Sequence, residues 1–156
     1  MEKIIAIAGL GLIGGSLALA LKANTACTVI GVDRDGAAQS AALAAGAVDA
    51  VGEESLKEAD MLILALPPAA VEPFLRRYAS SLKSGTLVTD VCGVKRAVVA
   101  ACGPLCRKQG LVFLGGHPMA GKDPPAAQST PGFRQEATGT SPGWPRWMRN
   151  CGPSYF

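Results

Sequence analysis

The chain has 156 residues and a formal net charge of +3, with 49% hydrophobic and 17% charged residues. This length suits one domain with a substantial core and is too short for two full domains. The small charge, without a basic stripe among aromatic residues, argues against nucleic-acid binding. Five cysteines without a C-x-x-C pair and a single histidine form no metal-ligand pattern. We therefore expect free thiols, no metal and a cytoplasmic protein.

An uncharged stretch at residues 4–21 is long enough to span a bilayer. A signal peptide or a membrane anchor is the alternative interpretation of this stretch. Four glycines interrupt it, however, at residues 9, 11, 14 and 15, and their spacing is that of a dinucleotide-binding turn. The sequence therefore favours a soluble domain over a membrane segment.

Strands and helices are predicted to alternate along most of the chain. Apolar runs predict strands at residues 3–8, 28–32, 47–51, 61–66, 86–89 and 111–114. Periodic or Ala-rich segments predict helices at residues 13–23, 36–45, 69–82 and 95–102. This alternation is typical of right-handed βαβ units, so we expect an α/β fold with a doubly wound parallel sheet of the Rossmann type. We assign this domain to residues 1–123.

The composition changes abruptly at Pro124. Residues 124–156 contain no Leu, Ile or Val, and Pro plus Gly account for ten of these 33 residues. Such a segment has no periodic apolar face, so we expect it to be disordered. A shift of the reading frame would produce the same abrupt change, and translation of the DNA in the other frames would test that explanation.

The glycine turn lies between the first predicted strand and the first predicted helix. In this context the first glycine permits a tight turn, the second lets the backbone approach a pyrophosphate, and the third lets the helix pack on the strand. The pyrophosphate would lie at the positive end of the helix. We assign cofactor contacts to Gly9, Leu10, Gly11, Leu12, Ile13 and Gly14.

Asp33 ends the second predicted strand, nineteen residues after Gly14. An acid at this position hydrogen-bonds the ribose 2′-hydroxyl and repels a 2′-phosphate, so the sequence favours NAD as the cofactor. The adjacent Arg34 could receive a 2′-phosphate, which keeps NADP as an alternative. A solvated loop aspartate is the non-functional interpretation of Asp33.

Two further segments follow predicted strands and would reach the same edge of the sheet. Leu66 and Pro67 follow the fourth strand, and Asp90 to Lys95 follow the fifth. Because ligands of open α/β sheets lie beyond the carboxyl ends of the strands, both segments are expected to flank the nicotinamide. Asp90 and Lys95 are explained equally well as a structural ion pair.

His117 lies in a Gly-Gly-His-Pro-Met-Ala-Gly loop after the sixth predicted strand. A histidine at that edge can accept a proton from a substrate hydroxyl while a hydride leaves the same carbon. A lone histidine is more often an ordinary loop or core residue, so the residues by themselves leave both interpretations open.

Three segments together resemble the prephenate dehydrogenase family: residues 9–17, 90–95 and 115–121. The related arogenate dehydrogenases share these motifs. The resemblance implies an NAD-dependent oxidation of prephenate to 4-hydroxyphenylpyruvate with loss of carbon dioxide, in tyrosine biosynthesis. It also implies that His117 is the catalytic histidine, which deprotonates the ring hydroxyl. Both prephenate and arogenate remain possible small-molecule substrates.

The resemblance also places several residues near the substrate, with two departures from the family pattern. Many members have a Ser, which contacts the substrate and the catalytic histidine, where this chain has Gly93. Cys92 or a water molecule would make that contact here. Members usually have Glu where this chain has Asp123. The substrate-side residues implied in this way are Cys92, Gly93, Lys95, Gly116 and Asp123.

Family members continue with a helical domain that forms a homodimer, closes the site and supplies a basic residue for the substrate carboxylates. Nothing after Asp123 resembles that domain. We therefore keep two hypotheses, a truncated dehydrogenase and an NAD-binding module without turnover. A third, a dehydrogenase of small hydroxy acids, is disfavoured because such enzymes use a lysine on a later helix and this chain has none after Lys122.

Overall fold

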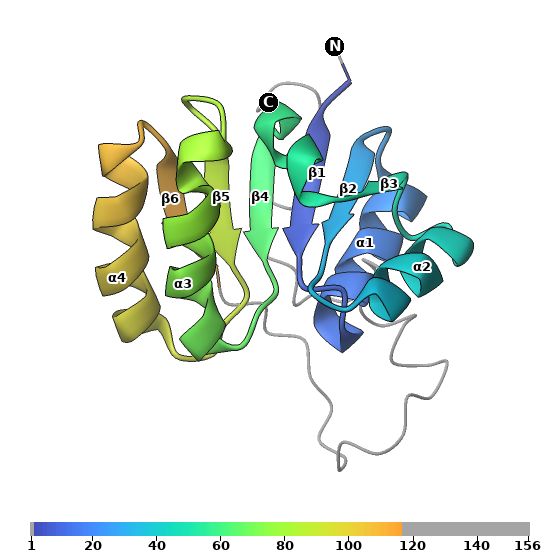
Figure 1. Cartoon of the computed structure of the whole chain (residues 1–156), viewed down its shortest axis with the longest axis horizontal. Coiled ribbons are helices and arrows are strands. Elements are labelled where there is room, and N and C mark those ends of the chain that lie inside the picture. Colours follow the sequence, from blue (N-terminus) through green and yellow to red (C-terminus); the bar gives the residue numbers. More distant parts are fainter. Residues whose placement is uncertain (1, 117–156) are drawn as a thin grey trace.

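Six parallel strands form one sheet in the order β3-β2-β1-β4-β5-β6 (Figure 1). The structure is a computed structural model in which residues 2–116 are described. The strands are β1 (Ile4–Ala8), β2 (Thr28–Val32), β3 (Ala50–Val51), β4 (Met61–Leu64), β5 (Leu87–Asp90) and β6 (Val112–Gly115). Each neighbouring pair of strands is parallel. The doubly wound parallel sheet predicted from the sequence is therefore confirmed.

Helices connect the strands and cover the sheet from both sides. They are α1 (Leu12–Asn24), α2 (Gly36–Ala44), α3 (Pro68–Tyr78) and α4 (Lys95–Lys108), with two short 3-10 helices, η1 (Glu53–Glu58) and η2 (Ala79–Ser81). In Figure 1, α3 and α4 lie side by side over the β5–β6 half of the sheet, whereas α1 and α2 lie near β2 and β3. The uncharged run at residues 4–21 is thus divided between β1, the glycine turn and α1. Within residues 2–116, no helix combines the length and the apolar character needed to cross a bilayer.

Strand β1 contributes side chains to two hydrophobic cores, one on each face of the sheet. Its side chains alternate, so Ala6 and Ala8 belong to the buried cluster that contains α3 and α4 residues. Ile5 and Ile7 belong to the cluster on the α1 and α2 side. Ile7 is 0% exposed, and burial of such a side chain contributes about 1.5–3 kcal/mol. A central strand buried on both faces reads as an unbroken apolar run, which is why the sequence identified it.

Helix α4 is longer than the sequence predicted. The predicted helix ended at Cys102, but α4 continues to Lys108 through Gly103 and Pro104. Proline inside a helix removes one backbone hydrogen bond, which normally favours an end. Cys102 and Cys106, one turn apart, are both 0% exposed in the core. The burial of these two side chains outweighs the missing backbone hydrogen bond at Pro104, and the helix continues. The predicted end of this helix at Cys102 was therefore wrong.

Strands β3 and β4 are shorter than predicted, by three and two residues. In β3 only Ala50–Val51 pairs with β2. The preceding residue, Asp49, instead exchanges two hydrogen bonds of 2.8 Å with the backbone of Val29, one through its amide and one through its carboxylate. Strand β4 ends at Leu64, although the Ala65 amide still donates to the Ala8 carbonyl at 2.8 Å, and Ala65 packs under the glycine turn.

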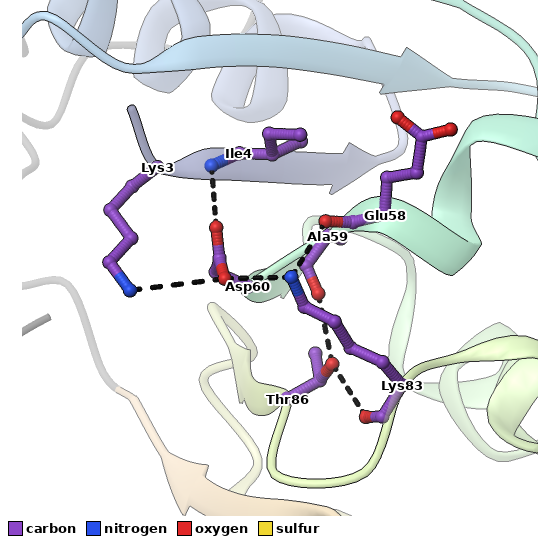
Figure 2. Close-up of polar contacts among 7 residues, drawn as sticks. All are labelled: Lys3, Ile4, Glu58, Ala59, Asp60, Lys83 and Thr86. Atoms are coloured by element: carbon purple, nitrogen blue, oxygen red, sulfur yellow. Dashed lines mark hydrogen bonds and ion pairs between the residues drawn. The ribbon is translucent and has the colours of Figure 1, made fainter. Parts of the chain in front are cut away.

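Asp60 joins the amino ends of three strands, at the edge opposite the predicted site (Figure 2). Its Oδ2 accepts the Ile4 amide at 2.9 Å, and its Oδ1 accepts the Lys83 ammonium at 2.8 Å. Its own carbonyl accepts the Leu87 amide at 3.0 Å. Partial burial opposes ionisation, but the hydrogen bonds from Ile4 and Lys83 hold the pKa of Asp60 below its usual value. This cluster orders the sheet and leaves the carboxyl edge free for a ligand.

Candidate functional site

The predicted site residues within residues 2–116 lie at one edge of the sheet, the edge formed by the carboxyl ends of the strands. The glycine turn follows β1, Asp33 follows β2, and Leu66 and Pro67 follow β4. Asp90 ends β5, and Gly116 directly follows β6. Because all six strands are parallel, these segments share one edge, where open α/β sheets bind their ligands.

The three glycines of the turn are required for different reasons. Gly9 has a φ of +90°, and a Cβ there would lie 2.3 Å from the Ala65 carbonyl oxygen. A Cβ on Gly14 would lie 1.8 Å from the Gly9 carbonyl oxygen. A Cβ on Gly11, in contrast, would meet nothing within 4 Å. Gly9 and Gly14 therefore permit the close packing of β1, β4 and α1, whereas Gly11 borders open space.

The amino end of α1 offers its backbone amides to a ligand. Gly11 caps the helix, no side chain caps it, and its first turn contains no acidic residue. The first hydrogen bond into the helix runs from the Gly15 amide to the Gly11 carbonyl, at 2.8 Å. The amides before Gly15 and the helix dipole therefore form a site suited to a pyrophosphate.

The apolar side chains of the turn have two orientations. Leu12 and Ile13 are 58% and 50% exposed at the start of α1, where they can contact a bound cofactor. Leu10 is buried and packs against Gly31 of β2, where a Cβ would lie 2.8 Å from Leu10 Cδ1. The buried side chain of Leu10 is therefore not available for the cofactor contact predicted for this residue, and its amide already donates to Asp33 Oδ2 at 2.7 Å.

Asp33 is half-buried beside the turn, and its carboxylate is already hydrogen-bonded. Oδ2 accepts the Leu10 amide at 2.7 Å, and Oδ1 accepts the Asp35 amide at 2.9 Å. Arg34 is exposed next to it. The sequence identified Asp33 but not its bond to Leu10. The one sequence signal that points to it is the prediction that both segments follow strands of the same parallel sheet, so that they reach the same edge.

Leu66 and Pro67 form the wall on the β4 side. A Cβ on Gly9 would lie 3.1 Å from Leu66 Cδ2, so Leu66 packs over the glycine turn. Pro67 is exposed and precedes the first residue of α3, which has no side-chain cap. Leu66 thus lies against the turn that leads into α1, and Pro67 follows it on the surface.

Asp90 is the most buried ionised side chain at this edge. Its side chain is 0% exposed, and it forms an ion pair with Lys95, whose side chain is 30% exposed. It also accepts the Cys92 amide at 3.0 Å and the Gly116 amide at 3.3 Å. The structural ion pair considered from the sequence is therefore present. Through it β5, α4 and the chain after β6 are held together.

Gly116 lies where no side chain fits. A Cβ there would approach the Asp90 carbonyl oxygen to 2.4 Å and Thr89 Oγ1 to 2.9 Å. Thr89 is buried, and its hydroxyl has no hydrogen-bond partner within the described part of the chain. The contact between Thr89 and Gly116 had no sequence signal, because a threonine in a strand suggests only an ordinary strand residue.

Cys92 points into the fold, whereas Gly93 is exposed. The Cys92 thiol donates to the Leu66 carbonyl at 3.5 Å. Burial, and then the negative charge of Asp90, raise the pKa of this thiol, so it stays protonated at neutral pH. Cys27, Cys92, Cys102 and Cys106 are all free, as predicted for these thiols.

His117 and Asp123 lie outside the described residues, as does the whole segment 124–156. Their predicted roles therefore stay predictions. In residues 2–116, no group of three or more His, Cys, Asp or Glu side chains could hold a metal ion. The described chain reaches Gly116, which immediately precedes His117 and is held by Asp90.

Comparison with known sequences identifies the family. The family model for the nucleotide-binding domain of prephenate dehydrogenase matches residues 17–137. The prephenate dehydrogenases of Lactococcus lactis and Bacillus subtilis are each 38% identical to this chain, over 125 and 126 residues. The matches cover 78% of this chain but only 35% and 34% of those two proteins. The chain thus spans about a third of the length of these relatives.

Solved structures agree with the sequence matches. Synechocystis arogenate dehydrogenase superposes with a TM-score of 0.71 at 33% identity, covering 78% of this chain and 42% of that one. A prephenate dehydrogenase from Aquifex aeolicus, in complex with hydroxyphenyl propionate and NAD+, has a TM-score of 0.71 at 25% identity, covering 80% and 44%. The chain therefore belongs to the prephenate dehydrogenase family, and it contains that family's NAD-binding Rossmann domain.

Proposed function

We propose that this chain carries the cofactor-binding half of an NAD-dependent prephenate dehydrogenase. The observation that supports this most directly is the uncapped amino end of α1 at Gly11, open to the carboxyl edge and flanked by Asp33. The two curated relatives, both named prephenate dehydrogenase, support the choice of reaction. The reaction would be the oxidative decarboxylation of prephenate to 4-hydroxyphenylpyruvate.

The residues at the edge fit NAD. The amides near Gly11 would hold the pyrophosphate, and no side chain competes for them. The carboxylate of Asp33 would accept the ribose hydroxyls, which favours NAD over NADP despite the neighbouring Arg34. Ile13 and Leu66 would border the nicotinamide half. When bound, NAD supplies the hydride acceptor.

His117 would act as the general base. It would accept the proton of the ring hydroxyl as the ring loses hydride and carbon dioxide, and the gain of aromaticity would drive the step. The hydrogen bond from the Gly116 amide to Asp90 holds the backbone immediately before His117. The other proposed substrate-side residues are Cys92, Gly93, Lys95 and Asp123.

Arogenate is the second candidate substrate. The arogenate dehydrogenase of Synechocystis is 33% identical to this chain, compared with 25% for the Aquifex prephenate dehydrogenase. Prephenate and arogenate share the ring on which His117 would act, and they differ in the side chain. A homodimer, as the resemblance implies, would accompany either substrate.

An absorbance assay of NADH formation tests the proposal. The protein is incubated with NAD and either prephenate or arogenate, and the His117→Asn variant is measured in parallel. Turnover with one substrate that is lost in His117→Asn supports the proposal and selects the substrate. Lys108→Gln, an exposed change at the far end of α4, is the matched control and is expected to retain the activity. NAD binding without NADH from either substrate would favour a binding module instead.

A further inference from the structure

Two hydrogen bonds attach the glycine turn to β2. The Gly9 amide donates to the Val32 carbonyl at 2.8 Å, which continues the ladder between β1 and β2. The Leu10 amide then donates to Asp33 Oδ2 at 2.7 Å. This second bond uses a side chain, and it is the same side chain that would bind the cofactor ribose.

Leu10 is held at both its side chain and its amide. The side chain lies in the same buried cluster as Val48, and its methyl groups lie against Gly31, where a Cβ would be 2.8 Å and 3.1 Å from them. The next residue, Gly11, begins the open end of α1, where a Cβ would meet nothing within 4 Å. The position of the Leu10 amide therefore sets the direction in which the following amides point.

The Asp33 carboxylate has enough acceptor sites for two tasks. An ionised carboxylate offers about four lone-pair sites. The Leu10 amide occupies one site on Oδ2, and the Asp35 amide occupies one on Oδ1 at 2.9 Å. The remaining sites are available for ribose hydroxyls.

We propose that Asp33 is a positioning residue for the pyrophosphate in addition to its contact with the ribose. Its Oδ2 fixes the glycine turn through the Leu10 amide. The affinity of the turn for phosphates therefore depends on Asp33 even when the ligand has no ribose hydroxyl. This inference rests on the proposed cofactor site, and it predicts that replacing Asp33 by an apolar residue weakens phosphate binding instead of simply admitting NADP.

The test separates the two tasks with two ligands and two variants. Calorimetry measures the affinity of the Asp33→Ala and Asp33→Asn variants for two nucleotides. These are ADP and 2′,3′-dideoxy-ADP, which lacks both ribose hydroxyls. Both variants lose the same negative charge, but only Asn retains an oxygen that can accept the Leu10 amide. We expect the Asn variant to bind dideoxy-ADP about tenfold more tightly than the Ala variant, as a charge-independent hydrogen-bond effect. Equal affinities of the two variants for dideoxy-ADP would overturn the proposal.

Hydrogen exchange of the Leu10 amide provides a readout without any ligand. Protection is expected in the unchanged protein and in Asp33→Asn, and it is expected to fall at least tenfold in Asp33→Ala. Asp35→Ala is the matched control, because it removes the bond from the Ala37 amide that caps α2 and leaves the Leu10 bond intact. Unchanged Leu10 protection in Asp33→Ala would refute the proposed positioning role. If the unchanged protein binds neither nucleotide, the proposed cofactor site fails, while the exchange data still decide the role of Asp33.

Discussion

Replacement of Asp90 by Ala is predicted to weaken the fold at the carboxyl edge more than any surface charge change. The substitution removes a carboxylate that is 0% exposed and that accepts the Lys95 ammonium. It also leaves the amides of Cys92 and Gly116 without their acceptor. Three donors, from the loop after β5, from α4 and from the chain after β6, thereby lose their common acceptor.

The expected magnitude follows from these contacts. Loss of one member of a buried ion pair costs about 3–5 kcal/mol. Lys95 is 30% exposed and can turn toward water, so the loss of the ion pair itself should cost about 3 kcal/mol, the lower end of that range. Each buried amide left without an acceptor adds about 1 kcal/mol or more. We expect Asp90→Ala to lower the free energy of unfolding by about 5 kcal/mol, which equals the whole stability of a domain at the lower end of the typical ~5–15 kcal/mol.

Urea denaturation of four proteins would measure this effect. They are the unchanged chain, Asp90→Ala, Lys95→Met and the double variant. Because the double variant leaves no unpaired ammonium, it should be less destabilised than the sum of the single changes, with a coupling of about 1 kcal/mol or more. Lys22→Met, which breaks the exposed pair with Asp49, is the control and should change stability little. Additive single changes, or an Asp90→Ala variant as stable as the control, would refute the role of Asp90.

Three further predictions use other parts of the fold. Gly14→Ala places a Cβ 1.8 Å from the Gly9 oxygen, so it should destabilise the chain by at least ~3 kcal/mol in the same urea assay. The pKa of Asp60 is lowered in the fold, so its contribution is present above its ordinary pKa and is lost as the pH falls through the lowered value. In unfolding experiments at decreasing pH, the Asp60→Asn variant should therefore lose less stability than the unchanged chain. The same dependence of stability on pH in both proteins would contradict this. Burial raises the pKa of Cys102 and of Cys106 to about 11, above the ordinary value of 9.0. Stability should therefore fall as the pH rises from about 9 to about 11, by on the order of 1–3 kcal/mol for each thiol, and a Cys102→Ala variant should show a smaller fall.

The features that could be predicted from the sequence are those with a local signal. Strands such as Ile4–Ala8 and Met61–Leu64 are buried on both faces, so their apolar runs are unbroken. The glycine spacing reflects close contacts within β1, the turn and α1, to which the structure adds the contacts of Gly9 with Ala65 and Leu66 and of Gly14 with Ala65. The alternation of strands and helices predicts a parallel sheet, and parallel strands bring the predicted residues at their carboxyl ends to one edge.

The features that could not be predicted depend on contacts between distant segments. The bond from Leu10 to Asp33 spans 23 residues, and the bond from Gly116 to Asp90 spans 26. Neither residue pair has a spacing that a single helix or strand would reveal. Likewise, the extension of α4 past Pro104 depends on the burial of Cys106 in a core built from other elements. Tertiary packing, and not local propensity, decides each of these three features.

The central claim is that this chain binds NAD at the open amino end of α1. Thermal or urea unfolding with and without about 1 mM NAD tests it, since a ~10 μM site would add about 2.7 kcal/mol to the free energy of unfolding. Gly11→Ala is the matched variant, because its Cβ meets no protein atom within 4 Å but would enter the space of the pyrophosphate. NAD is expected to stabilise the unchanged chain and to stabilise Gly11→Ala little or not at all, with equal stability of the two proteins without NAD. No stabilisation of the unchanged chain, or equal stabilisation of both, would contradict it.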